Sequence, residues 1–242
     1  MAKSKFQIAA VIGVEAANFV RGLNKASSKL TGWAKQTMKT IMSVSLKGAA
    51  AAGAAIAAFG AASLKEFATF EKGMLEVFTL LPGISKKAMD KMSDQTLELA
   101  QKMGTLPEEA VPALYSALSA GVPPGNVFNF LEAAVKASKA GVVDLNTAVD
   151  ALSTVVNTYG KENITAARAA DIMFEAVKMG KTTFGEMAAT MYNVLPIAKA
   201  ANVSFEDLAS AVATMTSKGT PTAQVMTQLK AAFQSIIAPS TR

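Results

Sequence analysis

Regularly spaced glycines constrain the fold of this chain more than any other feature of its sequence. Past residue 105, a glycine or asparagine recurs about every twenty residues, less evenly toward the end, at Gly121, Gly141, Gly160, Gly180, Asn202 and Gly219. These two residue types suit the left-handed backbone position that ends an α-helix. The series therefore predicts short helices of similar length, joined by tight turns.

Apolar residues between the glycines recur at helical spacing. Phe128, Leu131 and Val135 show this pattern in one segment, and Leu145, Val149 and Leu152 show it in the next. Such spacing places the apolar side chains on one face of each helix. We therefore predict an all-α fold, an array of short antiparallel helices in which each helix buries its face against its neighbours.

Helix starts and interruptions are also visible in the sequence. Thr183 and Glu186 have the spacing of a capping box, and Ser204 with Asp207 approximates one. The segments that start at Thr183 and Ser204 match each other at a spacing of 21 residues, as an internal repeat would. Thr105 is a third cap candidate. Two prolines, Pro112 and Pro196, fall inside helical patterns and are expected to kink or break them.

The composition excludes several classes of enzyme. The chain contains no cysteine and no histidine, which rules out a Ser-His-Asp triad, a Cys-His pair and an HExxH zinc site within this sequence. The acidic pairs Glu108/Glu109 and Glu206/Asp207 stand at predicted helix starts, where the helix dipole favours negative charge. We therefore expect no catalytic residue, no metal and no cofactor.

Charge is concentrated at the N-terminus. The chain carries a net charge of +6, yet residues 1–47 hold eight basic residues against the single acid Glu15. We interpret the chain as a basic arm (residues 1–47), an Ala/Gly-rich apolar helix (48–66) and a helical core domain (67–242). A basic arm suits an acidic partner, nucleic acid or an anionic membrane, or is simply a solvated helix face. Because few aromatic residues accompany the charges, we expect no specific nucleic-acid binding.

The arm contains two local signals. Residues 6–14 are rich in valine and isoleucine and are compatible with one short strand; they are too short and too polar for a signal peptide. The following residues predict a helix with a coiled-coil-like seam at 4-3-4-3 spacing. The seam is formed by Phe19, Leu23, Ala26, Leu30 and Trp33. These residues are candidates for self-association, the alternative being a helix that packs within its own domain.

The segment Gly48–Leu64 has no charge for seventeen residues and is bracketed by Lys47 and Lys65. Alanine and glycine dominate it, and its only large side chains are Ile56, Phe59 and Leu64. As a helix it would be about 25 Å long, slightly less than the roughly 30 Å hydrocarbon core of a bilayer. Two interpretations remain open: an alanine-rich helix that packs on other helices, and a segment that inserts into membranes.

Methionine is frequent, with thirteen in the chain. Core filling is the expected use, and an adaptable contact surface is the alternative. The methionines in the predicted core helices are Met173, Met179, Met187, Met191, Met215 and Met226.

Several blocks in this order resemble phage tail tape measure proteins, the family of long minor tail proteins. The first block is Phe70-Glu-Lys-Gly-Met74, just after the alanine-rich segment. The second runs from Ala140 through Leu152, and the third is the tandem unit from Thr183 to Ala232. The resemblance covers most of residues 16–238.

The resemblance implies a structural role without catalysis. Tape measure proteins are internal rulers around which the tail tube polymerises, and they leave the tail at infection, when some help the genome to cross the host membrane. The implied partners are the tail tube protein, tail assembly chaperones and baseplate or tail-tip proteins. The implied locations are the interior of the virion tail tube, the host cytoplasm during assembly and the host membrane on infection. Members of the family usually continue into long extended helices, so we expect this chain to be a fragment of a longer protein.

Two alternatives come from other classes of protein. One is a membrane-active helical protein that inserts through residues 48–64, and the other is a generic helical interaction scaffold.

A vesicle experiment separates the two interpretations of Gly48–Leu64. If the segment inserts, a peptide of residues 39–67 should release dye from anionic vesicles, because its lysine brackets can reach both interfaces while its apolar residues enter the bilayer. A matched peptide with Ile56→Lys and Phe59→Lys should release much less. Equal leakage from the two peptides, or none from either, would leave only the packing role.

Overall fold

The computed structural model describes residues 68–238. The chain divides by its contacts into two units, and the unit that starts at Thr69 is described here by itself. Predictions for the basic arm, the strand at residues 6–14 and the segment Gly48–Leu64 lie outside the described residues. So do all of the self-association and membrane candidates: Phe19, Leu23, Ala26, Leu30, Trp33, Ile56, Phe59 and Leu64.

Every regular element within residues 68–238 is helical, as predicted for an all-α fold. Residues 68–78 form the first described helix. The following helices are α3 (Lys86–Met103), α4 (Pro107–Ser119), α5 (Val127–Gly141), α6 (Leu145–Tyr159), α7 (Ala166–Met179), α8 (Phe184–Thr190), η1 (Met191–Asn193), α9 (Leu195–Ala200), α10 (Phe205–Ser217) and α11 (Thr222–Ile237).

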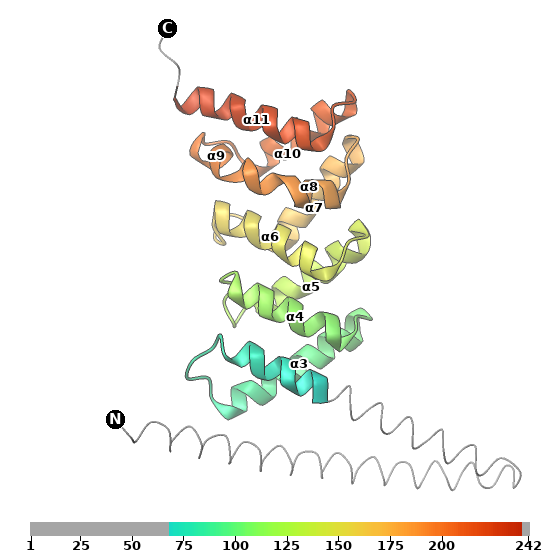
Figure 1. Ribbon diagram of the computed structural model, residues 1–242, viewed down its shortest axis with the longest axis vertical. Helices are drawn as coiled ribbons and strands as arrows, with labels where there is room; N and C mark the ends of the chain where they lie inside the picture. The colour runs from blue at the N-terminus through green and yellow to red at the C-terminus, as the bar shows by residue number, and fades with distance from the viewer. Residues whose placement is uncertain (1–67, 239–242) are drawn as a thin grey trace, which may run out of the picture. The chain divides into compact units, whose positions relative to one another are not determined.

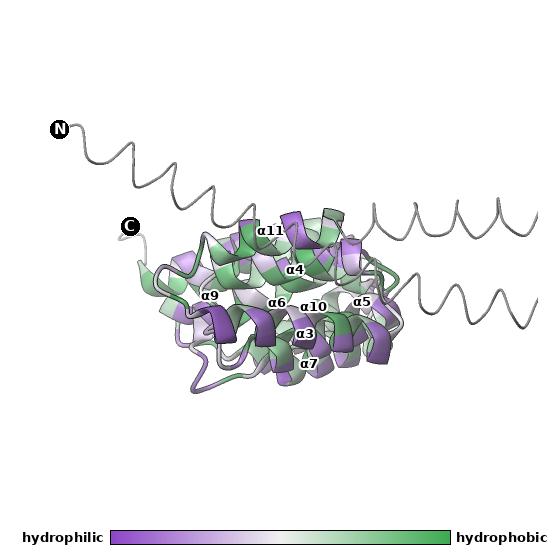
Figure 2. Ribbon diagram, turned by 90° about the horizontal axis from the view of Figure 1, so that it is seen from below, coloured by the Kyte–Doolittle hydropathy of each residue, from purple (hydrophilic) through white to green (hydrophobic). Residues whose placement is uncertain are grey.

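The helices stack in two rows, and successive helices alternate between the rows (Figure 1). We call α3, α5, α7 and α10 the first row, in which each helix packs against the next. We call α4, α6, the short helices α8 and α9, and α11 the second row, which is stacked in the same way. Hydrophilic residues are prominent on the side that carries α3 and α7 (Figure 2).

A continuous core lies between the rows and is rich in small side chains. Leu131, Leu152 and Leu195 are completely buried, and they are accompanied by many buried alanines on α4 to α7 and on α10. Small residues let neighbouring helices approach closely, and each helix of the interior is covered on two or three sides. The helices therefore depend on their neighbours rather than on their own propensity.

The cap residues differ in part from the sequence prediction. Thr183 is the N-cap of α8, where its side chain and that of Glu186 form a reciprocal capping box. Ser204 is the N-cap of α10 and accepts a hydrogen bond from the Asp207 amide at 3.1 Å. The prediction for Thr105 is wrong. The N-cap of α4 is Leu106. Pro107 takes the first helical position, where it has no N–H group that a cap would have to satisfy.

Sequence reasoning missed three further caps, each of which accepts an amide hydrogen bond. They are Ser85 for α3, Asp144 for α6 and Thr165 for α7. None has Glu or Gln three residues later, so the capping-box pattern did not identify them. The Thr147 side chain donates to the Asp144 carboxylate, as does the Thr147 amide, and these bonds lower the pKa of Asp144.

The recurring glycines serve two different purposes. Gly121, Gly160 and Gly219 have positive φ, as predicted for residues that end helices. Gly141 and Gly180 do not. After Gly141, the left-handed residue is Val142, with φ of 53°.

Close approach explains the two exceptions. A Cβ atom on Gly141 would lie 2.8 Å from Cβ and Cγ of Phe184. A Cβ atom on Gly180 would lie 2.5 Å from Oγ1 of Thr216 and 2.8 Å from Cα of Ala213. At these positions glycine lets one element contact another, and chain reversal is not its purpose.

The two prolines also differ from each other. Pro196 stands in the first turn of α9, and η1 separates that helix from α8, so the expected break occurs. Pro112 lies inside α4, which continues to Ser119 without a break.

Replacement of Gly180 by alanine tests the close packing of α7 on α10. We expect Gly180→Ala to lower the free energy of unfolding by about 1–3 kcal/mol, because the added methyl group meets the backbone of α10 and has no room. Gly125→Ala is the matched control, since a Cβ atom there would touch nothing within 4 Å and its φ is not positive. Chemical denaturation of the full chain measures both, and equal stability of the two variants would contradict the packing argument.

Candidate interaction surfaces

The described residues form several surfaces on which other molecules can bind. Among residues 68–238 no group of acidic side chains is arranged to hold a metal ion. No helix in the same range is long and apolar enough to cross a bilayer. The surfaces are the outer faces of the two rows and the grooves between their helices.

The two outer faces differ in charge. The first-row helices carry most of the charge, with seven charged residues on α3, three on α5 and four on α7, while α10 has only Glu206 and Asp207 in its first turn. The second-row helices carry few, namely Glu108, Glu109, Asp150, Glu186, Lys199 and Lys230. Their exposed positions hold mostly Asn, Gln, Ser, Thr and Ala, together with Tyr115 and the more exposed Tyr192. The stack therefore offers one charged face and one polar, weakly charged face.

An ion-pair cluster joins α3 to α5 on the charged face. Glu132 of α5 accepts from Lys136 at 2.9 Å on its own helix and from Lys102 at 3.2 Å on α3. The hydrogen bonds from Lys136 and then Lys102 lower the pKa of Glu132. These side chains are largely exposed, so the cluster orients the two helices more than it stabilises the fold.

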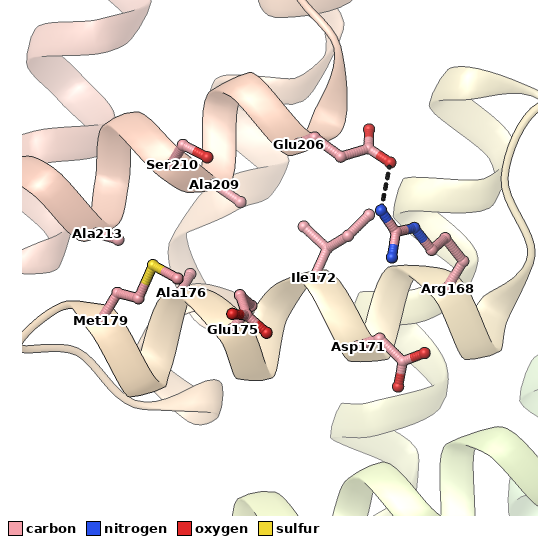
Figure 3. Close-up of a pocket in the computed structure, with 10 residues that line it drawn as sticks. All are labelled: Arg168, Asp171, Ile172, Glu175, Ala176, Met179, Glu206, Ala209, Ser210 and Ala213. Atoms are coloured by element: carbon pink, nitrogen blue, oxygen red, sulfur yellow. Dashed lines mark ion pairs between the residues drawn. The ribbon is translucent and has the colours of Figure 1, made fainter.

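A groove runs between α7 and α10 on the same face and has a volume of about 220 Å³ (Figure 3). Its floor is apolar and consists of Ile172 and Ala176 from α7 and of Ala209 and Ala213 from α10. The groove is hollow because three of these four residues are alanines, whose side chains leave the space between the helices unfilled.

Charged side chains surround the groove. At one end, a guanidinium nitrogen of Arg168 lies 3.4 Å from a carboxylate oxygen of Glu206 and joins the two helices (Figure 3). Asp171 and Glu175 lie along the α7 side. At the other end Met179 is 64% exposed, which does not fit the core-filling role expected of it. The groove thus combines an apolar floor, an excess of acid and an exposed, flexible side chain.

A second hollow lies near the start of the described residues. It has a volume of about 680 Å³ and is bordered by the turn at residues 80–84, by α3 and by the beginning of α5. Leu80, Leu81, Ile84 and Phe128 supply much of its lining, and Lys91 is the charged residue among them. This hollow is wider and more open than the groove between α7 and α10.

Buried polar contacts fix the junctions between rows. The hydroxyl group of Tyr159 donates to the carbonyl oxygen of Val203 at 3.1 Å, and its ring lies 5.9 Å from that of Phe205. The Nζ atom of Lys199 lies over the Tyr159 ring, 5.6 Å from its centroid. Burial, followed by the charges of Glu206 and Asp207, raises the pKa of Tyr159 to about 12. Tyr159 therefore stays neutral and ties the end of α6 to the start of α10.

The capping box of α8 belongs to a junction within the second row. The hydroxyl group of Thr222, on α11, lies 3.0 Å from the Glu186 carboxylate and 2.8 Å from the Thr182 hydroxyl. One carboxylate therefore caps α8 and holds α11 beside it. The spacing of Thr183 and Glu186 indicated the cap, but no local pattern pointed to Thr222, which is distant in the sequence.

Comparison with known proteins identifies the family. The model of the family described as phage-related minor tail protein matches residues 93–242. The chain is 33% identical over 148 residues to the probable tape measure protein of Clostridium phage phiCD119, a match that covers 60% of this chain and 16% of that protein. It is 24% identical over 239 residues to the tape measure protein of Pneumococcus phage Dp-1, covering 96% of this chain and 21% of that protein.

The chain thus spans about a sixth to a fifth of the length of these curated relatives. No solved structure matches it. Because the family match extends over more than half of the sequence, the chain belongs to the phage-related minor tail protein family.

Proposed function

We propose that this chain is a structural section of a tape measure protein and acts in tail assembly and tail length determination. The observation that carries the proposal is the two-row stack of helices, whose core is continuous from the helix at residues 68–78 to α11. Such a stack offers long outer faces for contact with other proteins. Two named relatives of the chain are tape measure proteins, which supports the same role.

The proposed partners are other tail components. Within the assembled tail the section would contact the tail tube protein and baseplate or tail-tip proteins, and before assembly it would contact chaperones. We place it in the virion tail, and in the host cytoplasm while tails are built. The polar, weakly charged face of the second row is suited to such contacts, because it exposes hydrogen-bonding side chains without the desolvation cost of charges.

Roles in genome delivery and at the host membrane are further hypotheses. They rest on the resemblance and on the sequence of Gly48–Leu64, which lies outside the described residues.

Within this role, the described section is better suited to binding other tail components than to setting the length of the tail. A straight α-helix gains about 1.5 Å per residue, whereas here the helices fold back on one another in two rows, so that each helix adds only its width to the stack. We therefore propose that the section anchors or organises the assembly, and that length is set mainly by other parts of the longer protein.

A variant with a disrupted core tests the role in assembly. In a phage that encodes this chain, we expect Leu152→Asp to abolish tail formation, because Leu152 is completely buried and a carboxylate there has no partner. Ala167→Asp is the matched control, since it adds the same charge at an exposed position in the first turn of α7, where the helix dipole favours it. Electron microscopy of lysates counts the tails. Normal tails with Leu152→Asp would overturn the proposal.

A deletion tests the division between organising and measuring. If residues 105–238 were an extended ruler, their removal in frame would shorten the tail by about 200 Å. We expect instead that tails fail to form, or that those formed are shortened by much less. A shortening close to about 200 Å, measured by electron microscopy, would assign the ruler function to this section.

A further inference from the structure

The groove between α7 and α10 is built to receive an apolar, basic segment. Its floor of Ile172 and small alanines accepts side chains of a partner, and Met179 can adapt to them. Glu206 is partly neutralised by its ion pair with Arg168. Asp171 and Glu175 form no ion pair within 4 Å among the described residues, so the α7 side of the groove keeps its negative charge.

The sequence contains a segment of the complementary kind. In residues 14–46, Arg21, Lys25 and Lys29 follow one another at four-residue spacing, which places them in one row along the predicted helix. At 100° per residue, Lys29 and Lys25 lie about 80° and 120° around the predicted helix from the apolar seam, so these two lysines stand to one side of it. The spacing of Lys25 and Lys29 equals that of Asp171 and Glu175 on α7, which also lie four residues apart.

We propose that the α7–α10 groove binds the basic segment 14–46 of a second copy of this chain. The apolar seam of that segment covers the alanine floor, while its basic row faces Asp171 and Glu175. The charges support this occupant, because residues 1–47 carry all of the chain's net positive charge. The helix at residues 68–78 stands at the opposite end of the stack from α10, which favours delivery by a neighbouring copy (Figure 1).

The lack of cysteine makes the occupant directly measurable. The variant Ser210→Cys places a single thiol at the exposed edge of the groove, and a benzophenone maleimide attached to it cross-links whatever lies there. Full-length chains grown in ¹⁴N and ¹⁵N medium are mixed before irradiation. We expect the label on one copy to cross-link to peptides from residues 14–46. In part of the cross-linked pairs, one peptide should carry ¹⁴N and the other ¹⁵N, which shows that the two came from different copies. Gln224→Cys, exposed on α11, is the control position and should not select this segment.

Charge-neutralising variants test the recognition itself. In the Ser210→Cys background, Asp171→Asn with Glu175→Gln should reduce the cross-link yield at least fivefold, and 500 mM NaCl should reduce it similarly. The matched control is Asp94→Asn with Glu98→Gln, which removes two exposed acids at the same spacing on α3 and should leave the yield unchanged. Circular dichroism checks that all variants fold.

Three results would overturn the proposal. The cross-links could fall outside residues 14–46, they could join residues of a single isotope only, or the two double variants could give equal yields. The first result would identify a different occupant, and the second would place the segment on its own copy. The third would show that the acids of the groove do not select the segment.

Discussion

The close contact between neighbouring helices of the same row is the interaction on which the rest of the structure depends. In each row a helix rests on the next helix of the same row, and it is covered by the other row from the side. Gly180 shows how tight this contact is, since even a methyl group there would meet the backbone at Ala213. Dense packing of this kind resists added volume, so small side chains at the contact points determine how closely the helices can stack.

Polar contacts then determine how the stacked helices are oriented. Glu132 links α3 to α5 and Glu206 links α7 to α10 on the first row, while Glu186 links α8 to α11 in the second row. Most of these groups are exposed and add little stability. Each of them joins two specific helices and so favours one orientation of that pair.

The unequal distribution of charge connects this architecture to the proposed function. A section of a tail protein must make contacts with several neighbours, and the stack gives it two chemically different faces. The first row exposes charged side chains and the acid-lined groove, where negative charge would attract a basic partner. The second row presents hydrogen-bonding side chains and exposed tyrosines, which suit broad contacts with little charge.

The sequence by itself determined the helical fold, the positions of most turns and two of the caps. These features arise from local rules: the spacing of Leu145, Val149 and Leu152 sets a helix face, and the hydroxyl group of Thr183 reaches a backbone amide only three residues away. The family resemblance also came from the sequence, through the order of its short blocks. Thr105 was misassigned because the local pattern did not account for the proline that follows Leu106. Only the tertiary structure decided that Gly141 and Gly180 serve close approach, that Thr222 meets Glu186 and that α7 and α10 enclose a groove. Those contacts join residues 33 to 43 positions apart, from Gly180 with Ala213 to Gly141 with Phe184, and no local periodicity encodes which helix lies beside which.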